Sequence, residues 1–433
     1  MKIINLIFSN YYFFFKKNFY YLFTFYLIFL LIVSWRLGIF IDYHRWYDGA
    51  EYVERARGIE FLNLNFKSLE DGFRPPLYPI VLKILNIIFP FNLTITAKIF
   101  NIFCLCFMPF ILYLLSQKDK NRHIKQIYFI KINLLLFFLP NFYLADLVYA
   151  EVLTILIFNV FLFYILSSYL NDNFNLRIIF ILSFLFVSLF YLKANLILLG
   201  LCFGLILFKK FKKNIKAFIY IGLLSSFLIF PWFIYMFNLT GQIKSANAQS
   251  VNRLYGMGLD VIYGQNINTI HGSFLIKAYK NSQEITEWFK YYRKNMNEEA
   301  LLAIYGISLE QQLLREKLSR ESIEKIWEYN KTIQIIYSFL KIPHVIGLNL
   351  RDTQDYSTFF YFLFVFGFGI AIIKTKSLKI FVYLNILVLV ALLVQTFLYV
   401  PTLRYSIYLL NSSLLIMAGF FLYVINKNKN LIK

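Results

Sequence analysis

The chain has 433 residues, of which 59% are hydrophobic and 15% charged, and its formal net charge is +21. A soluble domain is about half apolar and about a quarter charged, so this composition excludes an ordinary soluble protein and indicates an integral membrane protein. The length therefore corresponds to membrane spans and their loops in one domain, residues 1–433, and not to two or three soluble domains.

Continuous apolar runs predict an all-α polytopic membrane fold with about ten transmembrane helices, within a range of about nine to twelve. The spans are expected at residues 19–40, 97–116, 126–142, 149–168, 177–192, 195–208, 217–236, 357–373, 380–399 and 405–425. The first run is too long for the apolar part of a signal peptide and is expected to remain as an anchor. Residues 77–92 are expected to lie in the interface or to dip in partway, because a full crossing would invert every later span.

Basic residues are concentrated in the short segments between spans. Segments 16–17, 118–125, 172–177, 209–216, 374–379 and 427–433, together with Lys2, hold 19 of the 44 Lys and Arg, Arg177 among them, but only two acids, Asp119 and Asp172. The positive-inside rule places these segments in the cytoplasm and explains the net charge better than nucleic-acid binding does. The chain is therefore expected in the plasma (inner) membrane, with both termini inside.

Two longer segments then face outward, at residues 41–76 and 237–355. The second is far longer than an ordinary connection and is expected to be a mostly helical functional element. Amphipathic helices are expected within it around residues 284–296, 309–328 and 332–340.

Acidic residues are scarce, so their positions are informative. Of 23 acids, seven lie in the first outer loop and 12 in the second. The two acids outside both the loops and the basic segments are Asp146 and Glu151, which lie beside one outer span end. Ionisable residues within a membrane are costly and are functional candidates by default, unless they reach the headgroup zone.

The first outer loop ends with the sequence Arg-Pro-Pro-Leu-Tyr-Pro at residues 74–79. A proline biases the preceding residue toward extended geometry, so Arg74 is expected to be held at the membrane surface. The alternative is an interfacial arginine at a helix start. Upstream in the same loop, Asp48, Tyr52 and Ala56 follow one another at intervals of four.

This arrangement resembles the GT-C-type polyprenyl-phosphate glycosyltransferases, which include protein O-mannosyltransferase-like and aminoarabinose-transferase-like enzymes. Further similarity comes, in order, from Tyr149-Ala150-Glu151 at a span start, Lys193 at a span end, Pro231-Trp232 before the large loop and Arg404-Tyr405 at the last span. The sequence departs from the family pattern at Ala194, Asn195 and near Asn411, where proline is frequent, and its large loop matches no segment of the family.

The resemblance implies an inverting glycosyltransferase of GT-C-like fold. Such an enzyme transfers a hexosyl or pentosyl group from a polyprenyl-phosphate donor to an envelope lipid, glycan or protein at the outer, periplasmic or exterior face. It implies Asp48 as the general base and Glu151 as a supporting acid, with phosphate-binding cations at Arg74, Lys193 and Arg404. Other substrate-site candidates are Tyr52, Tyr78, Asp146 and Trp232.

Each of these roles has a simpler alternative. A loop aspartate can be a solvated surface acid, a span-opening glutamate can complement a helix N-terminus, and a boundary cation can snorkel. No organic cofactor is expected. A divalent metal stays open, with Asp42, Asp48 and Glu51 as its ligand candidates. The absence of a nucleotide-binding motif agrees with a lipid-linked donor. The alternatives to an enzyme are a transporter or flippase of lipid-linked sugars, or a non-enzymatic polymer-assembly scaffold.

Overall fold

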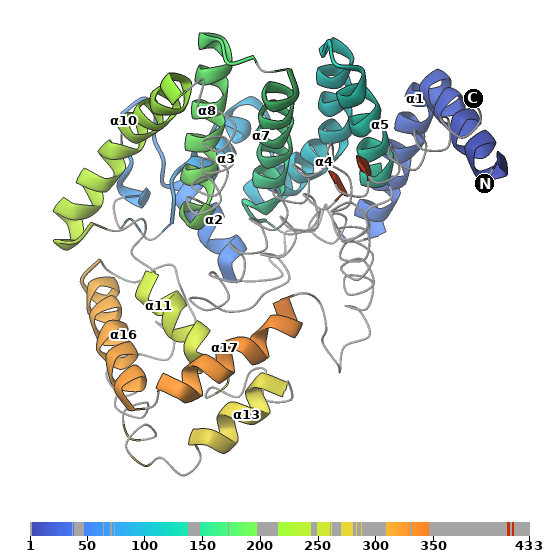
Figure 1. The fold of residues 1–433 in the computed structure, drawn as a ribbon. Helices are drawn as coiled ribbons and strands as arrows, with labels where there is room; N and C mark the ends of the chain where they lie inside the picture. Colours follow the sequence, from blue (N-terminus) through green and yellow to red (C-terminus); the bar gives the residue numbers. More distant parts are fainter. Residues whose placement is uncertain are drawn as a thin grey trace.

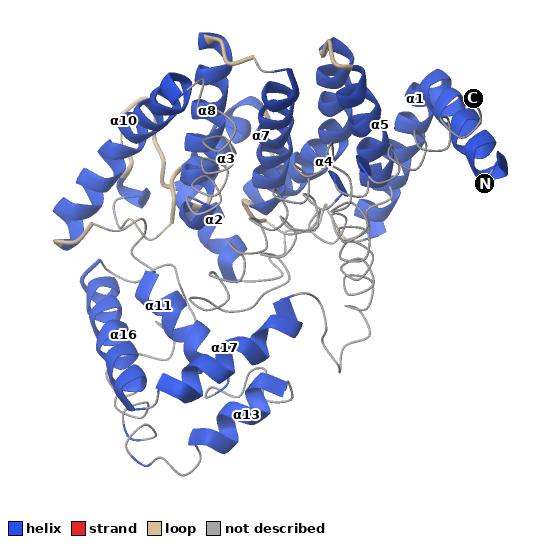
Figure 2. Cartoon of the chain, viewed as in Figure 1, coloured by secondary structure: helices blue, strands red, loops and turns tan. Residues whose placement is uncertain are grey.

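Helices make up most of the residues that the computed structural model describes. It describes residues 2–36, 38, 47–63, 65–69, 72, 74–136, 148–171, 173–196, 215–243, 249–259, 261, 270–279, 283, 287, 309–329, 331–345, 414, 415, 418 and 419. Figure 2 shows the described residues as helices and loops, and their single strand-like feature is an isolated antiparallel bridge between Glu60 and Asn65. The prediction of an all-helical protein is confirmed for this part of the chain.

The apolar runs form helices. They are α1 (Lys2–Arg36), α3 (Leu77–Ile88), α4 (Leu93–Lys118), α5 (Arg122–Leu136), α7 (Glu151–Asn171), α8 (Leu176–Leu192) and α10 (Ile215–Thr240). By length and composition, α4, α7 and α10 can each cross a membrane, which takes about 20 apolar residues. The expected spans at 357–373 and 380–399, and most of those at 195–208 and 405–425, lie outside the described residues.

Helix ends differ from the ends of the expected spans. Helix α1 begins at Lys2, well before residue 19, because apolar and aromatic residues without a helix breaker precede Lys16. Helix α4 begins at Leu93, before the expected residue 97, because the Asn92 side chain accepts a hydrogen bond from the backbone N–H of Thr94 at 2.8 Å. Such an N-cap satisfies a backbone donor that the helix itself leaves unpaired.

The long helices stand side by side in a row (Figure 1). Helix α4 packs against α5 and α7, α7 against α8, and α8 against α10. At one end of the row, Asp119 follows α4 and accepts hydrogen bonds from Ser167 Oγ and, at 3.0 Å, from Asn171 Nδ2 near the end of α7. At the opposite end, Glu151 at the start of α7 meets Lys193, the residue after α8. The basic turn at 118–125 and the Glu151–Lys193 pair therefore lie at opposite ends.

Large apolar side chains cover the outside of α8 and α10. Phe184 of α8 and Phe227 of α10 are 67% and 74% exposed, and Phe180, Leu223 and Phe230 are exposed beside them. A continuous apolar surface of this kind is rare on soluble monomers and marks a contact with lipid or protein. These faces agree with the membrane character of the sequence.

A second group of helices lies beyond one end of the row, on the side where α2 (Tyr47–Arg57) sits (Figure 1). It consists of α11 (Gln249–Leu254), α13 (Ile270–Tyr279), α16 (Leu309–Tyr329) and α17 (Lys331–Val345). Its core, which includes Leu254, Leu275 and Tyr337, is separate from the core of the row. Helices α16 and α17 coincide with two of the three amphipathic helices expected, whereas the third, at 284–296, falls outside the described residues except at Glu287.

The segment at 77–92 forms the short helix α3, which packs against α2, α4 and α8. Its 12 residues extend for about 18 Å, less than the hydrocarbon core of a bilayer, about 30 Å. Tyr78, Pro79 and Leu82 face the protein, whereas Ile84 and Ile87 are exposed. A single straight helix of this length is too short for the hydrocarbon core, and its buried start holds the segment that ends at Arg74 against the row.

Candidate functional site

Helix α2 carries the expected base and the residues around it. Asp48 lies in its first turn, although the Asp48 side chain is outside the described part of the structure. Tyr52 and Ala56, one and two turns later, are buried and pack toward α3 and α4. The interval of four thus follows the buried face of a helix, as residues at that spacing share a face.

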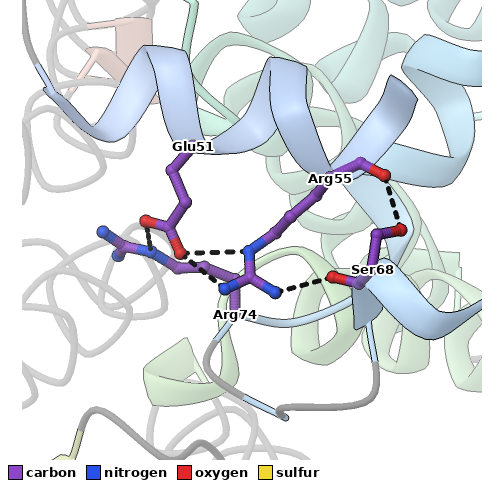
Figure 3. Close-up of polar contacts among 4 residues, drawn as sticks. All are labelled: Glu51, Arg55, Ser68 and Arg74. Atoms are coloured by element: carbon purple, nitrogen blue, oxygen red, sulfur yellow. Dashed lines mark hydrogen bonds and ion pairs between the residues drawn. The ribbon is translucent and has the colours of Figure 1, made fainter. Parts of the chain in front are cut away.

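Glu51 organises the charges on α2 (Figure 3). Its Oε1 accepts hydrogen bonds from Arg55 Nε and lies 3.0 Å from Arg55 Nη2, while its Oε2 accepts from Arg74 Nε at 3.0 Å. The Glu51 side chain is 0% exposed and that of Arg74 is 16% exposed. Arg55 also binds the return loop, the segment between α2 and α3, because it donates to the Ser68 backbone oxygen at 2.9 Å. Ser68 Oγ in turn donates to the Arg55 backbone oxygen at 2.8 Å.

Arg74 is held by more than the two prolines that follow it. Pro76 immediately precedes α3 and has helical backbone angles, so the proline pair sets the direction of the chain into that helix. The Arg74 guanidinium carbon lies 5.7 Å from the centre of the Tyr52 ring, in addition to the contact of its Nε with Glu51. Ion-pair and cation–π contacts therefore both orient the guanidinium.

Glu151 and Lys193, expected separately as an acid and a phosphate-binding cation, form an ion pair. Lys193 Nζ donates to Glu151 Oε1 at 2.5 Å, and the side chains are 10% and 2% exposed. The pair joins the start of α7 to the end of α8. Removal of one partner from such a buried pair leaves an uncompensated charge, so the two residues depend on each other. In this structure Lys193 is bound to a carboxylate and is not an isolated cation.

Tyr78 lies between the two groups of charges. Its ring meets Tyr52 edge-on, with centroids 5.0 Å apart. Burial raises the pKa of Tyr78 well above its ordinary value, and the nearby Tyr52, Cys104 and Glu151 raise it further. The phenol therefore keeps its proton at physiological pH. Its hydroxyl is buried and makes no hydrogen bond with the described residues.

Trp232, another expected site residue, does not join this group. Trp232 belongs to an apolar cluster with Tyr191 and Tyr235, whose ring centroids lie 6.2 and 5.6 Å from its own. Asp146 and Arg404 lie outside the described residues, as does Asp42.

No group of metal-binding side chains occurs in the part of the chain that the structure describes. Of the three ligand candidates, Asp42 and the Asp48 side chain are not described, and Glu51 faces two arginines. A carboxylate shared between two cations is a poor metal ligand, because a cation would have to displace a charged partner. The described residues therefore give a metal no support at Glu51.

The sequence interpretation passed over Arg55, and it named Glu51 only as a candidate metal ligand and not as a partner of the arginines. Their spacing of four on a helix was a usable signal, because a glutamate followed by an arginine at that spacing forms a common ion pair. The contact with Arg74, 23 residues away, has no such local signal.

The assembled residues place cations, each fixed by a carboxylate, at the end of the row that carries α2. Such an arrangement suits the binding of an anionic group. Comparisons of the chain with protein-family models, curated proteins and solved structures find no match.

Proposed function

We propose that this protein is an integral membrane glycosyltransferase of the GT-C type, which transfers a sugar from a polyprenyl-phosphate donor to an envelope acceptor. The observation that carries the proposal is the position of Arg74. Its guanidinium is fixed against Glu51 of α2, three residues after Asp48, at the end of the row from which the second group of helices extends. A candidate base and a candidate phosphate-binding cation thus belong to one small assembly.

The proposed reaction needs few groups. A nucleophilic oxygen of the acceptor attacks the anomeric carbon of the sugar, and the bond from that carbon to the phosphate oxygen breaks. The polyprenyl phosphate leaves with the bonding electrons, and Asp48 takes the proton of the acceptor. Arg74 stabilises the negative charge that grows on the departing phosphate. Attack opposite the leaving group inverts the anomeric configuration.

The proposal extends to the topology. We place about ten spans in the plasma membrane, with the basic turns inside and the site on the outer face, toward the periplasm or cell exterior. Support comes from the opposite locations of the basic turn at 118–125 and the Glu51–Arg74 contact, together with the sorting of lysines into short segments. The partners are then the lipid-linked donor, an envelope lipid, glycan or protein acceptor, and membrane lipids.

The test is sugar transfer by purified protein from a lipid-linked donor to a cell-envelope extract. We expect Asp48→Asn to leave a folded, membrane-inserted protein and to lower the rate by about 10²–10⁴, the usual loss when a general base is removed. Glu54→Gln is the matched control, because Glu54 is an exposed acid of the same helix that pairs with Arg57. Transfer by Asp48→Asn at the wild-type rate would show that Asp48 is not the base.

A transporter or flippase of lipid-linked sugars is the second candidate, and Lys131 favours it. This lysine is fully buried in α5, and its Nζ donates to Asn159 Oδ1 of α7 at 2.6 Å. Charged groups deep within a bundle often mark transport pathways. If wild-type protein transfers no sugar but moves lipid-linked sugar between the leaflets of vesicles, the second candidate replaces the first.

A further inference from the structure

We infer that Glu51 is the positioning residue for Arg74, an inference that rests on the proposed function. The Glu51 carboxylate divides its oxygens between two arginines, with Oε1 at 3.0 Å from Arg55 and Oε2 at 3.0 Å from Arg74. No part of the Glu51 side chain is exposed, so water does not compete for these contacts. Charge-assisted hydrogen bonds in such a setting are stronger than neutral ones.

The backbone alone cannot aim the Arg74 guanidinium. The prolines that follow restrict the main chain at Arg74, but they leave the torsions of its long side chain free. An arginine side chain carries about 2 kcal/mol of rotamer entropy. A favourable contact must offset the loss of that entropy if the guanidinium is to be held in one orientation before the ligand binds. The contact with Glu51 restrains the side chain through Nε, in addition to the contact with the Tyr52 ring. Figure 3 shows the two terminal nitrogens of Arg74 directed away from the Glu51 carboxylate.

Glu51 is itself anchored from the other side. Arg55 binds Glu51 with one edge of its guanidinium and the Ser68 backbone oxygen with Nη1 at 2.9 Å. Ser68 lies in the return loop that leads to Arg74, and its hydroxyl donates to the backbone of α2 at Arg55. The sequence of contacts Ser68–Arg55–Glu51–Arg74 therefore ties the cation to the helix and to the loop that precede it (Figure 3).

Two explanations of Glu51 must be separated. If it only compensates the buried charge of Arg55, removal of both residues restores the site. If it positions Arg74, removal of both takes away the Glu51 contact that orients Arg74, although no uncompensated charge remains at Arg55. The variants are Glu51→Gln, the double variant Glu51→Gln/Arg55→Gln, Arg74→Gln as the reference for complete loss, and Glu54→Gln as the control on the same helix.

The probe is dodecyl phosphate, titrated into the purified full-length protein in detergent, with neutral dodecyl glucoside as the comparison. We expect the dodecyl phosphate Kd to rise about tenfold or more in Glu51→Gln and in the double variant, close to the rise in Arg74→Gln. Glu54→Gln should bind dodecyl phosphate as the wild type does, and dodecyl glucoside should bind all variants equally. In the transfer assay, the KM for the donor should rise more than kcat falls, because the cation contacts the phosphate before and during reaction.

The outcomes separate this inference from the proposed function. Wild-type affinity for dodecyl phosphate in the double variant overturns the positioning role, even if transfer is fully established. Absence of transfer by the wild type overturns the proposed function, while the dodecyl phosphate titration still decides the role of Glu51. If Glu51→Gln alone does not fold, the double variant, which removes the uncompensated Arg55 charge, gives the result. A rise in Kd in the double variant that matches Arg74→Gln supports the inference.

Discussion

Lys193 and Lys131 are two largely buried lysines that the bundle treats in different ways. Lys193, directly after α8, meets the carboxylate of Glu151 at 2.5 Å. Lys131, within α5, meets the neutral amide of Asn159 at 2.6 Å and the face of Tyr128, with Nζ 5.5 Å from the ring centroid. Among the described residues, Lys131 has no ion-pair partner. Asn159 lies eight residues after Glu151, so the two sites are separated by about 12 Å along α7.

The difference shows where the protein maintains charge. A buried cation opposite a carboxylate keeps its charge at a moderate cost in free energy. A buried cation opposite a neutral amide is compensated much less, so most of its desolvation penalty remains. Ion pairs at Glu51–Arg74 and Glu151–Lys193 place the maintained charges at the end where α2 lies. If chemistry occurs there, substitutions at that end should affect transfer, and substitutions at Lys131 should affect it little.

The largest effect expected from this comparison is that of Glu151→Gln. The substitution keeps the shape of the side chain but leaves the Lys193 ammonium without its carboxylate, which costs about 3–5 kcal/mol in a buried pair. We expect a large fall in the thermal midpoint in detergent and a loss of transfer of at least about 10²-fold. Thermal unfolding and the transfer assay measure the two effects separately.

The double variant Glu151→Gln/Lys193→Met shows whether this loss reflects structure or chemistry. Removal of both charges should restore most of the thermal stability, because neither partner is then left uncompensated. Transfer should stay low if the pair belongs to the site. Recovery of wild-type transfer would mean that Glu151 and Lys193 only tie α7 to α8.

The sequence predicted the positions of Glu151 and Lys193 along the helices but not the contacts of the charged residues. Apolar runs located the helices, and their ends placed Glu151 and Lys193 at span boundaries, because transfer of charge into lipid is costly wherever the chain folds. The Glu151–Lys193 contact itself depends on α7 and α8 being neighbours, which no local pattern encodes. The contact of Glu51 with Arg74 depends in the same way on the path of the return loop.

Lys131 illustrates the reverse limitation. A lysine in an apolar run is visible in the sequence, but its orientation toward lipid, a cavity or another helix is not. Its partner Asn159 lies on α7, and the two meet only because α5 packs against that helix. Helix ends were also misjudged, since capping by Asn92 and the apolar residues before Lys16 extend helices beyond the hydrophobic stretch.

A smaller effect is expected for Lys131→Met. Methionine is apolar and of similar length, so it removes the buried ammonium without leaving a large cavity. The gain from removing that charge is offset by the lost hydrogen bond to Asn159, worth about 1–3 kcal/mol when the acceptor stays buried. We expect stability close to that of the wild type and transfer within about twofold of it, with Lys125→Met, on the same helix, as the control. A selective loss of lipid-linked sugar movement across vesicles would favour the transporter interpretation instead.

The smallest effect is expected for Tyr78→Phe, a substitution between the Glu51–Arg74 and Glu151–Lys193 ion pairs. The Tyr78 hydroxyl is buried and unpartnered among the described residues, and a buried polar group without a hydrogen bond costs about 1–3 kcal/mol. Phenylalanine keeps the edge-on contact with Tyr52, so the packing around Arg74 should persist. We therefore expect a thermal midpoint equal to or slightly above that of the wild type and transfer at the wild-type rate. A large loss of transfer in a stable variant would show instead that the substrate reaches this hydroxyl. The reacting groups would then extend from Arg74 inward toward Glu151, and the site would be deeper than the Glu51–Arg74 contact indicates.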